Sequence, residues 1–291
     1  MRARYPDTEG YIERGGVRVF YEAFGDGSPT VMFLPAWAIV HSRAWKAQIP
    51  FFARHYRVVT FDPRGNGRSD RPPDAAAYSS RESMQDALAV MDVTDTDRAV
   101  LIGFSAGAWL ATLLAVEHPE RVLGAVLAGP SSPLGPPQRP NRFNDVLDTD
   151  EGWAKNNRYF YRRHYPEFVK FFLTEMFPEP HSTKQIEDGI GWGMETDAAT
   201  LVATRDAPST MAHLADASAA VAFYHRIHCP VLVLQGDQDH MISPARGAAV
   251  ADASGATFVT VKGGGHHVFA RDPVKMNLLA RSFIDQIRRQ M

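Results

Sequence analysis

The chain has 291 residues, of which 45% are hydrophobic and 22% are charged, and its formal net charge is −2. This composition predicts a globular protein of one large or two small domains, and it argues against a basic nucleic-acid-binding protein. The only cysteine, Cys229, excludes an internal disulfide and is expected as a small core residue of a protein in a reducing, cytoplasmic compartment.

The first half of the chain alternates strand and helix patterns. Alternating residues around Gly15-Gly16 predict a hairpin. Strands are expected at 30–35, 56–62, 98–103 and 121–129, and helices at 44–56 (interrupted near Pro50), 81–94 and 106–117. Residues 99–116 form an uncharged run, but Gly103, Ser105 and Gly107 indicate a strand, a turn and a helix rather than a membrane span. The N-terminus shows no apolar signal segment, so we expect no membrane insertion.

The segment from about Ser132 to Arg226 has a different character. It opens with proline-rich "SSPLGPPQRPNR", shows no core strand and is rich in aromatic residues. We expect a helical insertion between two strands of the sheet. Most of its aromatics should pack its own core, and a few should line an apolar pocket. They are Trp153, Tyr159, Phe160, Tyr161, Tyr165, Phe168, Phe171, Phe172, Phe177 and Trp192.

The C-terminal part returns to the first pattern. Strands are expected at 230–237 and 256–263, and an amphipathic helix at 272–290 with Pro273 near its start. Alternating strands and helices with continuously apolar strands predict an α/β fold with a mostly parallel sheet covered on both faces. Functional residues in such sheets lie at the carboxyl ends of the strands.

Ser105 lies in the pattern Gly103-Phe104-Ser105-Ala106-Gly107, between a predicted strand and a predicted helix. This G-x-S-x-G context is typical of a nucleophile elbow, a turn so tight that only small residues fit two positions either side of the serine. A serine hydroxyl needs a base, and the base needs a carboxylate to orient it. The strand expected at 230–237 leads into Asp237 and Asp239, and the one at 256–263 leads into His266 and His267, so the order serine, acid, histidine is present.

Taken together, these motifs resemble the α/β-hydrolase fold family over nearly the whole chain. The matching stretches are "FLPAWAIVHSRAW", "VVTFDPRGNGRSDRP", "LIGFSAGAW", "HPERVLGAVLAG", "PVLVLQGDQDHMISP" and "GGGHHVFARDPVKMN". The resemblance implies an eight-stranded, mostly parallel sheet with helices on both faces and an inserted helical cap. The core would comprise 1–131 and 227–291, and the cap 132–226.

The resemblance also assigns roles to residues. In the family pattern G-x-x-D the last residue is the acid, here Asp239, and the histidine directly after glycine is the base, here His266. Ser105 would be the nucleophile. The oxyanion hole would use the backbone amides of Ala106 and Trp37, although "PAW" stands where common members have His-Gly.

The implied reaction is hydrolysis, through an acyl-enzyme, of an ester, lactone or related carbonyl bond in a small, largely apolar or aromatic substrate. Serine in the nucleophile position argues against dehalogenation and epoxide opening, for which the family uses aspartate. C–C bond hydrolysis and acyl transfer remain alternatives. A weaker likeness to hydrolase-like modules fused to bacterial nucleotide cyclases leaves a small-molecule sensor as another. No cofactor or metal is implied, and the oligomeric state stays open.

Several further residues have expected structural roles. Adjacent histidines on an extended segment point to opposite sides, which argues against a zinc site at His266 and His267. His267 should therefore pack on the pocket rim or face solvent. His41 is expected as a polar loop histidine. "DPRGNGRSD" lacks a P-loop lysine followed by serine or threonine, so we expect its side chains Arg64, Arg68 and Asp70 in hydrogen bonds or ion pairs.

Overall fold

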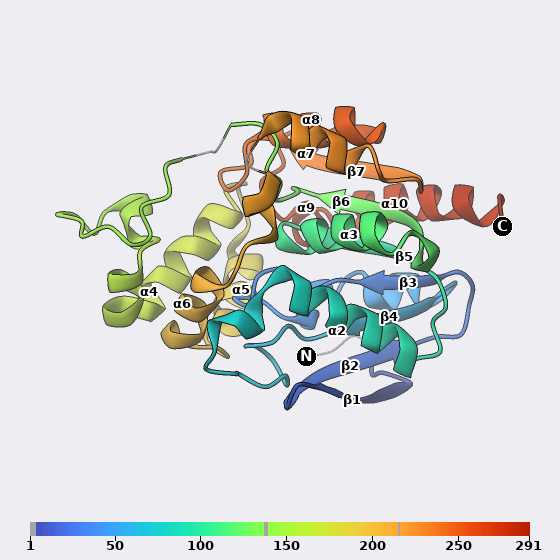
Figure 1. The fold of residues 1–291 in the computed structure, drawn as a ribbon, viewed down its shortest axis with the longest axis horizontal. Helices are drawn as coiled ribbons and strands as arrows, with labels where there is room; N and C mark the ends of the chain where they lie inside the picture. Colours follow the sequence, from blue (N-terminus) through green and yellow to red (C-terminus); the bar gives the residue numbers. More distant parts are fainter. Residues whose placement is uncertain (1–3, 137–138, 215) are drawn as a thin grey trace.

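The computed structural model describes residues 4–136, 139–214 and 216–291. Residues 1–3 of the predicted core, and Pro137, Gln138 and residue 215 of the predicted insertion, lie outside the described residues. A twisted sheet forms the middle layer, helices cover both of its faces, and a group of helices extends from one end of the sheet (Figure 1).

The sheet has eight strands in the order β1-β2-β4-β3-β5-β6-β7-β8 (Figure 1). Only the β1–β2 and β2–β4 pairs are antiparallel, and all other neighbours are parallel. The predicted mostly parallel, eight-stranded sheet is therefore confirmed. The strands are β1 (Thr8–Arg14), β2 (Val17–Phe24), β3 (Thr30–Phe33), β4 (Arg57–Phe61), β5 (Ala99–Phe104), β6 (Val122–Ala128), β7 (Val231–Gly236) and β8 (Thr257–Val261).

The central strands owe their place to continuous apolar sequence. Every residue of β5, β6 and β7 is buried, as expected for strands covered on both faces. The edge strands β1 and β8 expose several residues each. The most apolar strands therefore occupy the middle of the sheet, and Ser105 follows one of them.

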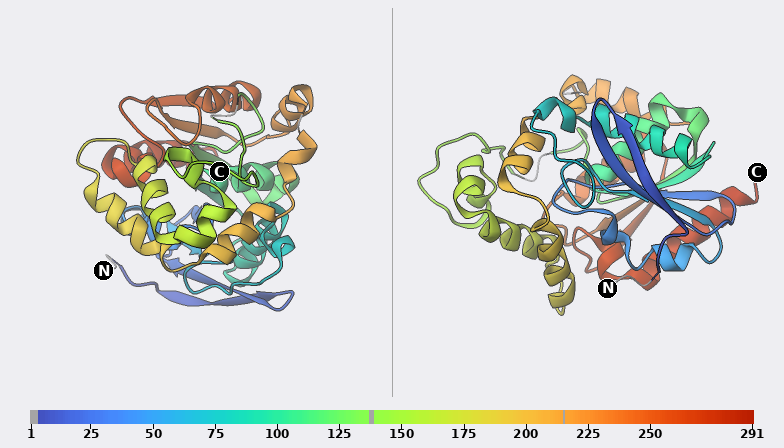
Figure 2. Two further views of the ribbon diagram at one scale, coloured as in Figure 1. Left: turned by 90° about the vertical axis from the view of Figure 1, so that its left-hand side faces the viewer. Right: turned by 90° about the horizontal axis from the view of Figure 1, so that it is seen from below.

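Helices divide between the two faces of the sheet (Figures 1 and 2). Trp109 of α3 and Tyr224 of α7 belong to one buried cluster, while Trp45, Phe52 and Phe269 belong to the other. The first face carries α2 (Ser80–Val93), α3 (Ala106–Glu117), α7 (Ala217–Tyr224) and α8 (Pro244–Ser254); the second carries α1 (Ile49–Phe52), α9 (Val268–Arg271) and α10 (Pro273–Arg288).

The helix predicted over 44–56 is much shorter than expected. The structure has a 3-10 helix η1 (Ser42–Trp45), then α1 (Ile49–Phe52) with Pro50 in its first turn. Proline lacks an amide hydrogen and clashes with the preceding turn, so one helix could not continue through this position. Two further short 3-10 helices are η2 (Ala75–Tyr78) and η3 (Pro119–Arg121).

The described residues between β6 and β7 form helices from residue 152 onward and no strand, as the sequence predicts, whereas those at 129–136 and 139–151 form no regular element. Its elements are η4 (Gly152–Lys155), α4 (Arg158–Met176), α5 (Thr183–Gly193), α6 (Ala198–Asp206), η5 (Thr210–Leu214) and α7. We call this segment the β6–β7 insertion. Helices α4, α5 and α6 gather at one end of the sheet, beyond the carboxyl end of β6 (Figure 1). The division into a core and a cap at 131/132 and 226/227 stays a prediction.

The long helix α4 is kinked. His164 has non-helical backbone angles (φ −136°, ψ 44°), two residues before Pro166 inside the helix. The proline ring prevents a straight helix and accounts for the bend. Within the described residues, no helix combines the length and apolar character needed to cross a bilayer.

Candidate active site

Ser105 occupies a strained turn between β5 and α3. Its backbone angles are φ 55° and ψ −121°, a conformation that non-glycine residues rarely adopt. Its amide donates to the Ala128 carbonyl at 2.9 Å, and its carbonyl accepts from the amides of Ala108 and Ser131 at 3.1 and 3.2 Å. The end of β6 therefore fixes the serine from one side and the first turn of α3 from the other.

Two glycines make this turn possible. A Cβ atom on Gly103 would lie 2.2 Å from the Gly107 carbonyl oxygen, and one on Gly107 would lie 2.7 Å from the Pro35 carbonyl oxygen. Real Cβ atoms do not approach backbone this closely, so the strand, the helix and the 35–38 loop could not pack with larger residues there. This is the steric reason behind the sequence pattern.

Asp239 and His266 form a buried pair at the carboxyl ends of β7 and β8. The Asp239 Oδ2 atom lies 2.9 Å from His266 Nδ1, and the two residues are 3% and 2% exposed. The other carboxylate oxygen, Oδ1, accepts from the backbone amides of Met241 and Ile242 at 2.7 and 2.9 Å. This carboxylate is therefore fully engaged, and it holds the imidazole by Nδ1.

The carboxyl of Asp239 is held in its ionised form. Burial acts to raise its pKa, but the charge and hydrogen bond of His266, together with the amides of Ile242 and Met241, keep the pKa below its ordinary value. Asp237 lies apart from this pair, exposed, and accepts from the Gly263 amide at 2.8 Å. Asp239, and not Asp237, therefore contacts His266, and its role as the catalytic acid stays a prediction.

The β6–β7 insertion positions the histidine loop. Glu179, after α4, accepts from the Gly265 amide at 2.6 Å, and the His266 amide donates to the Met176 carbonyl at 3.2 Å. Gly129, at the end of β6, packs against the side chains of both Asp239 and His266. The position of His266 is therefore fixed by the β6–β7 insertion and by the end of β6.

The amides of Trp37 and Ala106 remain available as donors. No described residue accepts a hydrogen bond from either of them. Both residues line one cavity of about 170 Å³. The Trp37 indole turns toward the insertion, donating to Thr204 Oγ1 at 2.6 Å and packing edge-on against Phe172 at 5.2 Å between ring centres.

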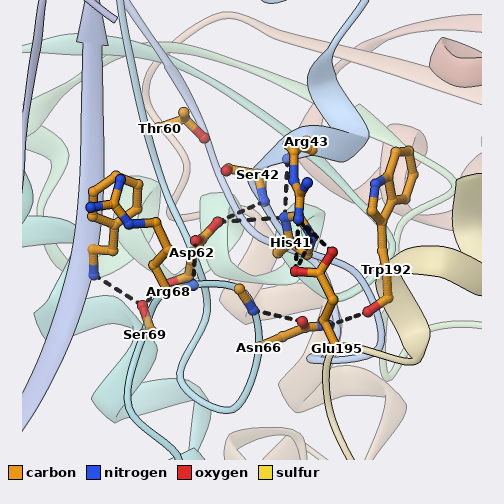
Figure 3. Close-up of polar contacts among 12 residues, drawn as sticks. His41, Ser42, Arg43, Thr60, Asp62, Asn66, Arg68, Ser69, Trp192 and Glu195 are labelled. Carbon is orange, nitrogen blue, oxygen red and sulfur yellow. Dashed lines mark hydrogen bonds and ion pairs between the residues drawn. The ribbon is translucent and has the colours of Figure 1, made fainter. Parts of the chain in front are cut away.

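A polar network ties the loop that carries Trp37 to both the core and the insertion (Figure 3). Asn66 Nδ2 donates to the Ala38 carbonyl at 2.9 Å and to the Trp192 carbonyl at 3.2 Å. Arg43 Nη2 donates to both carboxylate oxygens of Glu195, at 2.5 and 2.7 Å. Sequence reasoning missed this role of Asn66, because a partner 126 positions away leaves no local pattern.

His41 lies inside the same network and is more buried than expected, at 3% exposure. Its ring nitrogens lie 3.7 Å from Asp62 Oδ1 and 3.5 Å from Glu195 Oε2, and Arg43 Nη2 lies 3.0 Å from Nε2. Burial is the main cause that lowers the pKa of His41, against the raising effect of the Asp62 charge. His41 is therefore a loop histidine that packs where the loop contacts Glu195 of the insertion.

His267 does not face solvent, so that alternative is wrong. It is 1% exposed and stacks on Phe104 with ring centres 3.7 Å apart and planes within 10°. Phe177 and Trp45 also contact it, each at 5.9 Å. Neither ring nitrogen has a hydrogen-bond partner among the described residues, and burial, helped by His266, lowers the pKa of His267 to about 3.

The remaining predicted polar residues take structural contacts. Arg64 forms a buried ion pair with Asp86 through Nε at 2.6 Å, and Arg68 and Asp70 pair with Glu9 and Arg18. Gln235, which belongs to no motif in the sequence, donates to Asp239 Oδ2 at 3.0 Å from within β7. In the part of the chain that the structure describes, no group of three or more His, Cys, Asp or Glu side chains is arranged to hold a metal ion.

Comparison with known proteins places this geometry in context. A sequence-family profile described as "alpha/beta hydrolase fold" matches residues 29–273. The putative non-heme bromoperoxidase BpoC of Mycobacterium tuberculosis is 26% identical over 280 residues, covering 94% of this chain and 99% of that protein. The 2-hydroxymuconate semialdehyde hydrolase of Pseudomonas sp. (strain CF600) is 34% identical over 130 residues, covering 43% of this chain but only 44% of its own length.

The structural comparison gives the same answer. The solved structure titled "Est816 as an N-Acyl homoserine lactone degrading enzyme" superposes with a TM-score of 0.77 at 25% identity, covering 94% of this chain and 100% of that one. The profile match spans the strands that carry Trp37, Ser105, Asp239 and His266. With the eight-stranded sheet and the serine turn after β5, the profile match shows that this chain belongs to the α/β-hydrolase fold family.

Proposed function

We propose that the protein is a serine hydrolase that cleaves an ester, lactone or related carbonyl bond of a small molecule through an acyl-enzyme. The observation that carries the proposal is the buried 2.9 Å contact between Asp239 Oδ2 and His266 Nδ1. With Nδ1 donating to the carboxylate, the lone pair of the imidazole lies on Nε2, where a base must have it. The strained backbone of Ser105 supports its role as the nucleophile.

The reaction proceeds in two halves. Ser105 Oγ attacks the substrate carbonyl while His266 Nε2 takes the hydroxyl proton. The histidine then returns this proton to the leaving alkoxide, so that an alcohol departs and an acyl-serine remains. Water repeats the sequence: His266 takes one proton of the water, the hydroxide adds to the acyl carbon, and Ser105 leaves with its proton restored.

The Asp239 carboxylate and the two free amides have separate roles. Asp239 fixes the imidazole orientation and stabilises it while it is charged. The amides of Ala106 and Trp37 would donate to the developing oxyanion. Removing one such donor typically costs about 10²–10³ in kcat.

We infer the substrate class from the names of similar proteins and from the aromatic residues of the insertion. The Est816 title names N-acyl homoserine lactone degradation, so lactones belong in the first substrate panel with aryl esters. Because one relative is named 2-hydroxymuconate semialdehyde hydrolase, C–C bond hydrolysis remains an alternative reaction, alongside acyl transfer, and the substrate panel should test both. We include a cytoplasmic location in the proposal because the single cysteine, Cys229, cannot form an internal disulfide, which fits a reducing compartment.

Labelling with a fluorophosphonate probe tests the nucleophile. We expect the wild type to be labelled and Ser105→Ala not to be labelled. Ser131→Ala, which removes a neighbouring hydroxyl, is the matched control and should label like the wild type. If the wild type and Ser105→Ala react equally little, the serine-hydrolase proposal is wrong and a sensor without turnover becomes the better description.

A further inference from the structure

A cavity between the β6–β7 insertion and the β7–α8 region is lined by arginines. Its volume is about 610 Å³, which is typical of small-molecule sites. Among the described residues that line it, four are arginines and none is an aspartate or glutamate. These arginines are Arg139, Arg142, Arg205 and Arg246.

Three of the four arginines have no ion pair with a carboxylate among the described residues. Arg139 Nη2 donates to the His240 carbonyl, and its guanidinium stacks over Trp153 at 3.5 Å from the ring centre. Arg246 Nε donates to the Pro136 carbonyl at 2.9 Å. Because a guanidinium carries five N–H donors, each retains several for a ligand.

The other two arginines are engaged in part. Arg205 Nη2 donates to Asn141 Oδ1 at 3.2 Å, and Arg142 Nε pairs with Asp145 Oδ2 at 3.1 Å in an exposed contact. Two further carboxylates attract Arg139: Glu175, which also accepts from the Trp153 indole at 3.2 Å, and Asp239. Asp239 is already paired with His266, so the Arg142–Asp145 pair and these two carboxylates do not balance four guanidiniums, and the cavity keeps excess positive charge.

Two of these guanidiniums also sit partly out of water. Burial lowers the pKa of Arg139 and of Arg246, although arginine stays charged at neutral pH. A buried, unpaired cation is costly, and an anion that enters the cavity relieves that cost. The planar fork of a guanidinium matches the two oxygens of a carboxylate.

The cavity adjoins the proposed catalytic residues. Met241 lines it and donates its backbone amide to Asp239 Oδ1 at 2.7 Å. Trp153 lines it too and packs on Phe172, which in turn packs on Trp37 at 5.2 Å between ring centres. The cavity is therefore linked to the acid loop through Met241, and to the loop that supplies the proposed oxyanion donor through Trp153 and Phe172.

We propose that this cavity binds a carboxylate carried by the substrate, so that the enzyme prefers acidic esters or lactones with an apolar body. The inference rests on the proposed serine hydrolase function and narrows its substrate class. Trp153, Met211 and Met241 supply the apolar wall, and Arg139 and Arg246 supply the principal anion contacts.

Matched ester pairs test the preference. One pair places the charge on the acyl side: 4-nitrophenyl hydrogen adipate against 4-nitrophenyl hexanoate. The other places it on the alcohol side: 4-carboxyphenyl butanoate against phenyl butanoate. We expect kcat/KM for the anionic member to exceed that of its neutral partner by about tenfold to a hundredfold in at least one pair, the range of one or two charge-assisted hydrogen bonds.

Variants assign the preference to the cavity. Arg139→Gln and Arg246→Gln should each reduce the anionic-to-neutral ratio by about tenfold, and the double variant should abolish it. Arg289→Gln removes one positive charge at the end of α10 and should leave the ratio unchanged. The proposal is overturned if the neutral esters are preferred in both pairs, or if the preference survives in the double variant.

A binding experiment separates this inference from the proposed function. Calorimetry with Ser105→Ala should detect adipate binding that is weakened at least tenfold when Arg139→Gln and Arg246→Gln are added, with uncharged hexanamide as the control. Adipate binding without any ester turnover would support the carboxylate-binding cavity and refute the proposed hydrolase function. Ester turnover without adipate binding or anionic preference would refute the cavity alone.

Discussion

Replacing His267 by phenylalanine should make the protein less sensitive to acid. The native imidazole is fully buried, with Phe104 and Phe177 stacked against it and Trp45 edge-on. Neither nitrogen is paired among the described residues, and an unpaired buried polar group costs about 1–3 kcal/mol. A phenyl ring keeps the stacking and removes that cost, but it is larger than imidazole and strains a packed core by a similar amount, so at pH 7.5 we expect His267→Phe to be as stable as the wild type within about 1 kcal/mol.

The difference should appear on acidification. The pKa of His267 is about 3 in the folded protein and about 6.5 in an unfolded chain. Between these values the unfolded chain binds a proton that the folded protein does not, so the free energy of unfolding falls as the pH falls. At 1.36 kcal/mol per pH unit, the 1.5 units between pH 6.5 and 5.0 amount to about 2 kcal/mol. The wild type should lose this amount between pH 7.5 and 5.0 in excess of the variant.

Urea unfolding at pH 7.5, 6.0 and 5.0 measures this difference directly. Contributions from titrating groups that do not interact with His267 are common to the two proteins and cancel in the comparison. His228→Gln, which removes an exposed histidine, is the matched control and should follow the wild type. The reasoning is refuted if His267→Phe and the wild type lose the same free energy within about 0.5 kcal/mol, a margin comparable to the error of the extrapolation.

Three further predictions concern the proposed site. Asp239→Asn should lower kcat by about 10⁴-fold, because the imidazole loses the carboxylate that orients and stabilises it, whereas Asp237→Asn should retain most activity; equal losses in an ester assay would contradict the assignment. Gly129→Ala brings a Cβ to 3.1 Å from His266 Nδ1 and should reduce both kcat and stability. Gly255→Ala, at a similar positive φ but with nothing within 4 Å, should cost only about 1 kcal/mol in thermal unfolding; similar kinetics for the two would exclude a steric effect on the histidine. Asn66→Ala leaves two carbonyls without their buried donor, so it should lower the free energy of unfolding by about 2–3 kcal/mol. It should also lower kcat, and a change in KM with kcat unchanged would disprove this role of Asn66.

The positions of most strands could be predicted from the local sequence. Strands such as β5, β6 and β7 are runs of apolar residues with clear ends, so their existence and order of succession followed from hydrophobic pattern alone. Helix α8 was not predicted because "PARGAAVADAS" has little amphipathic character, although Pro244 at its start and Gly255 at its end are ordinary helix boundary signals. The lateral order of the strands rests on contacts between distant segments, and the sequence predicts no such order.

The site shows the same division between local and distant information. The turn at Ser105 could be predicted because its steric demand falls on neighbours two positions away, at Gly103 and Gly107. The Asp239–His266 contact required knowledge that the ends of β7 and β8 meet, which the family pattern supplied. The environment of His267 could not be predicted, because its stacking on Phe104 joins residues that are far apart in the sequence.

The ties between the insertion and the Trp37 loop bear on protein engineering. A helical insertion between two strands invites exchange with the corresponding segment of a relative, as a route to new substrates. Here such a graft would also have to present a backbone carbonyl to Asn66 and a carboxylate to Arg43, as Trp192 and Glu195 do. A chimaera lacking either would loosen the loop that carries the Trp37 amide, so altered specificity and reduced turnover would arrive together. Exchanges that keep the α5–α6 connection of this chain and replace only residues facing the arginine-lined cavity avoid that coupling.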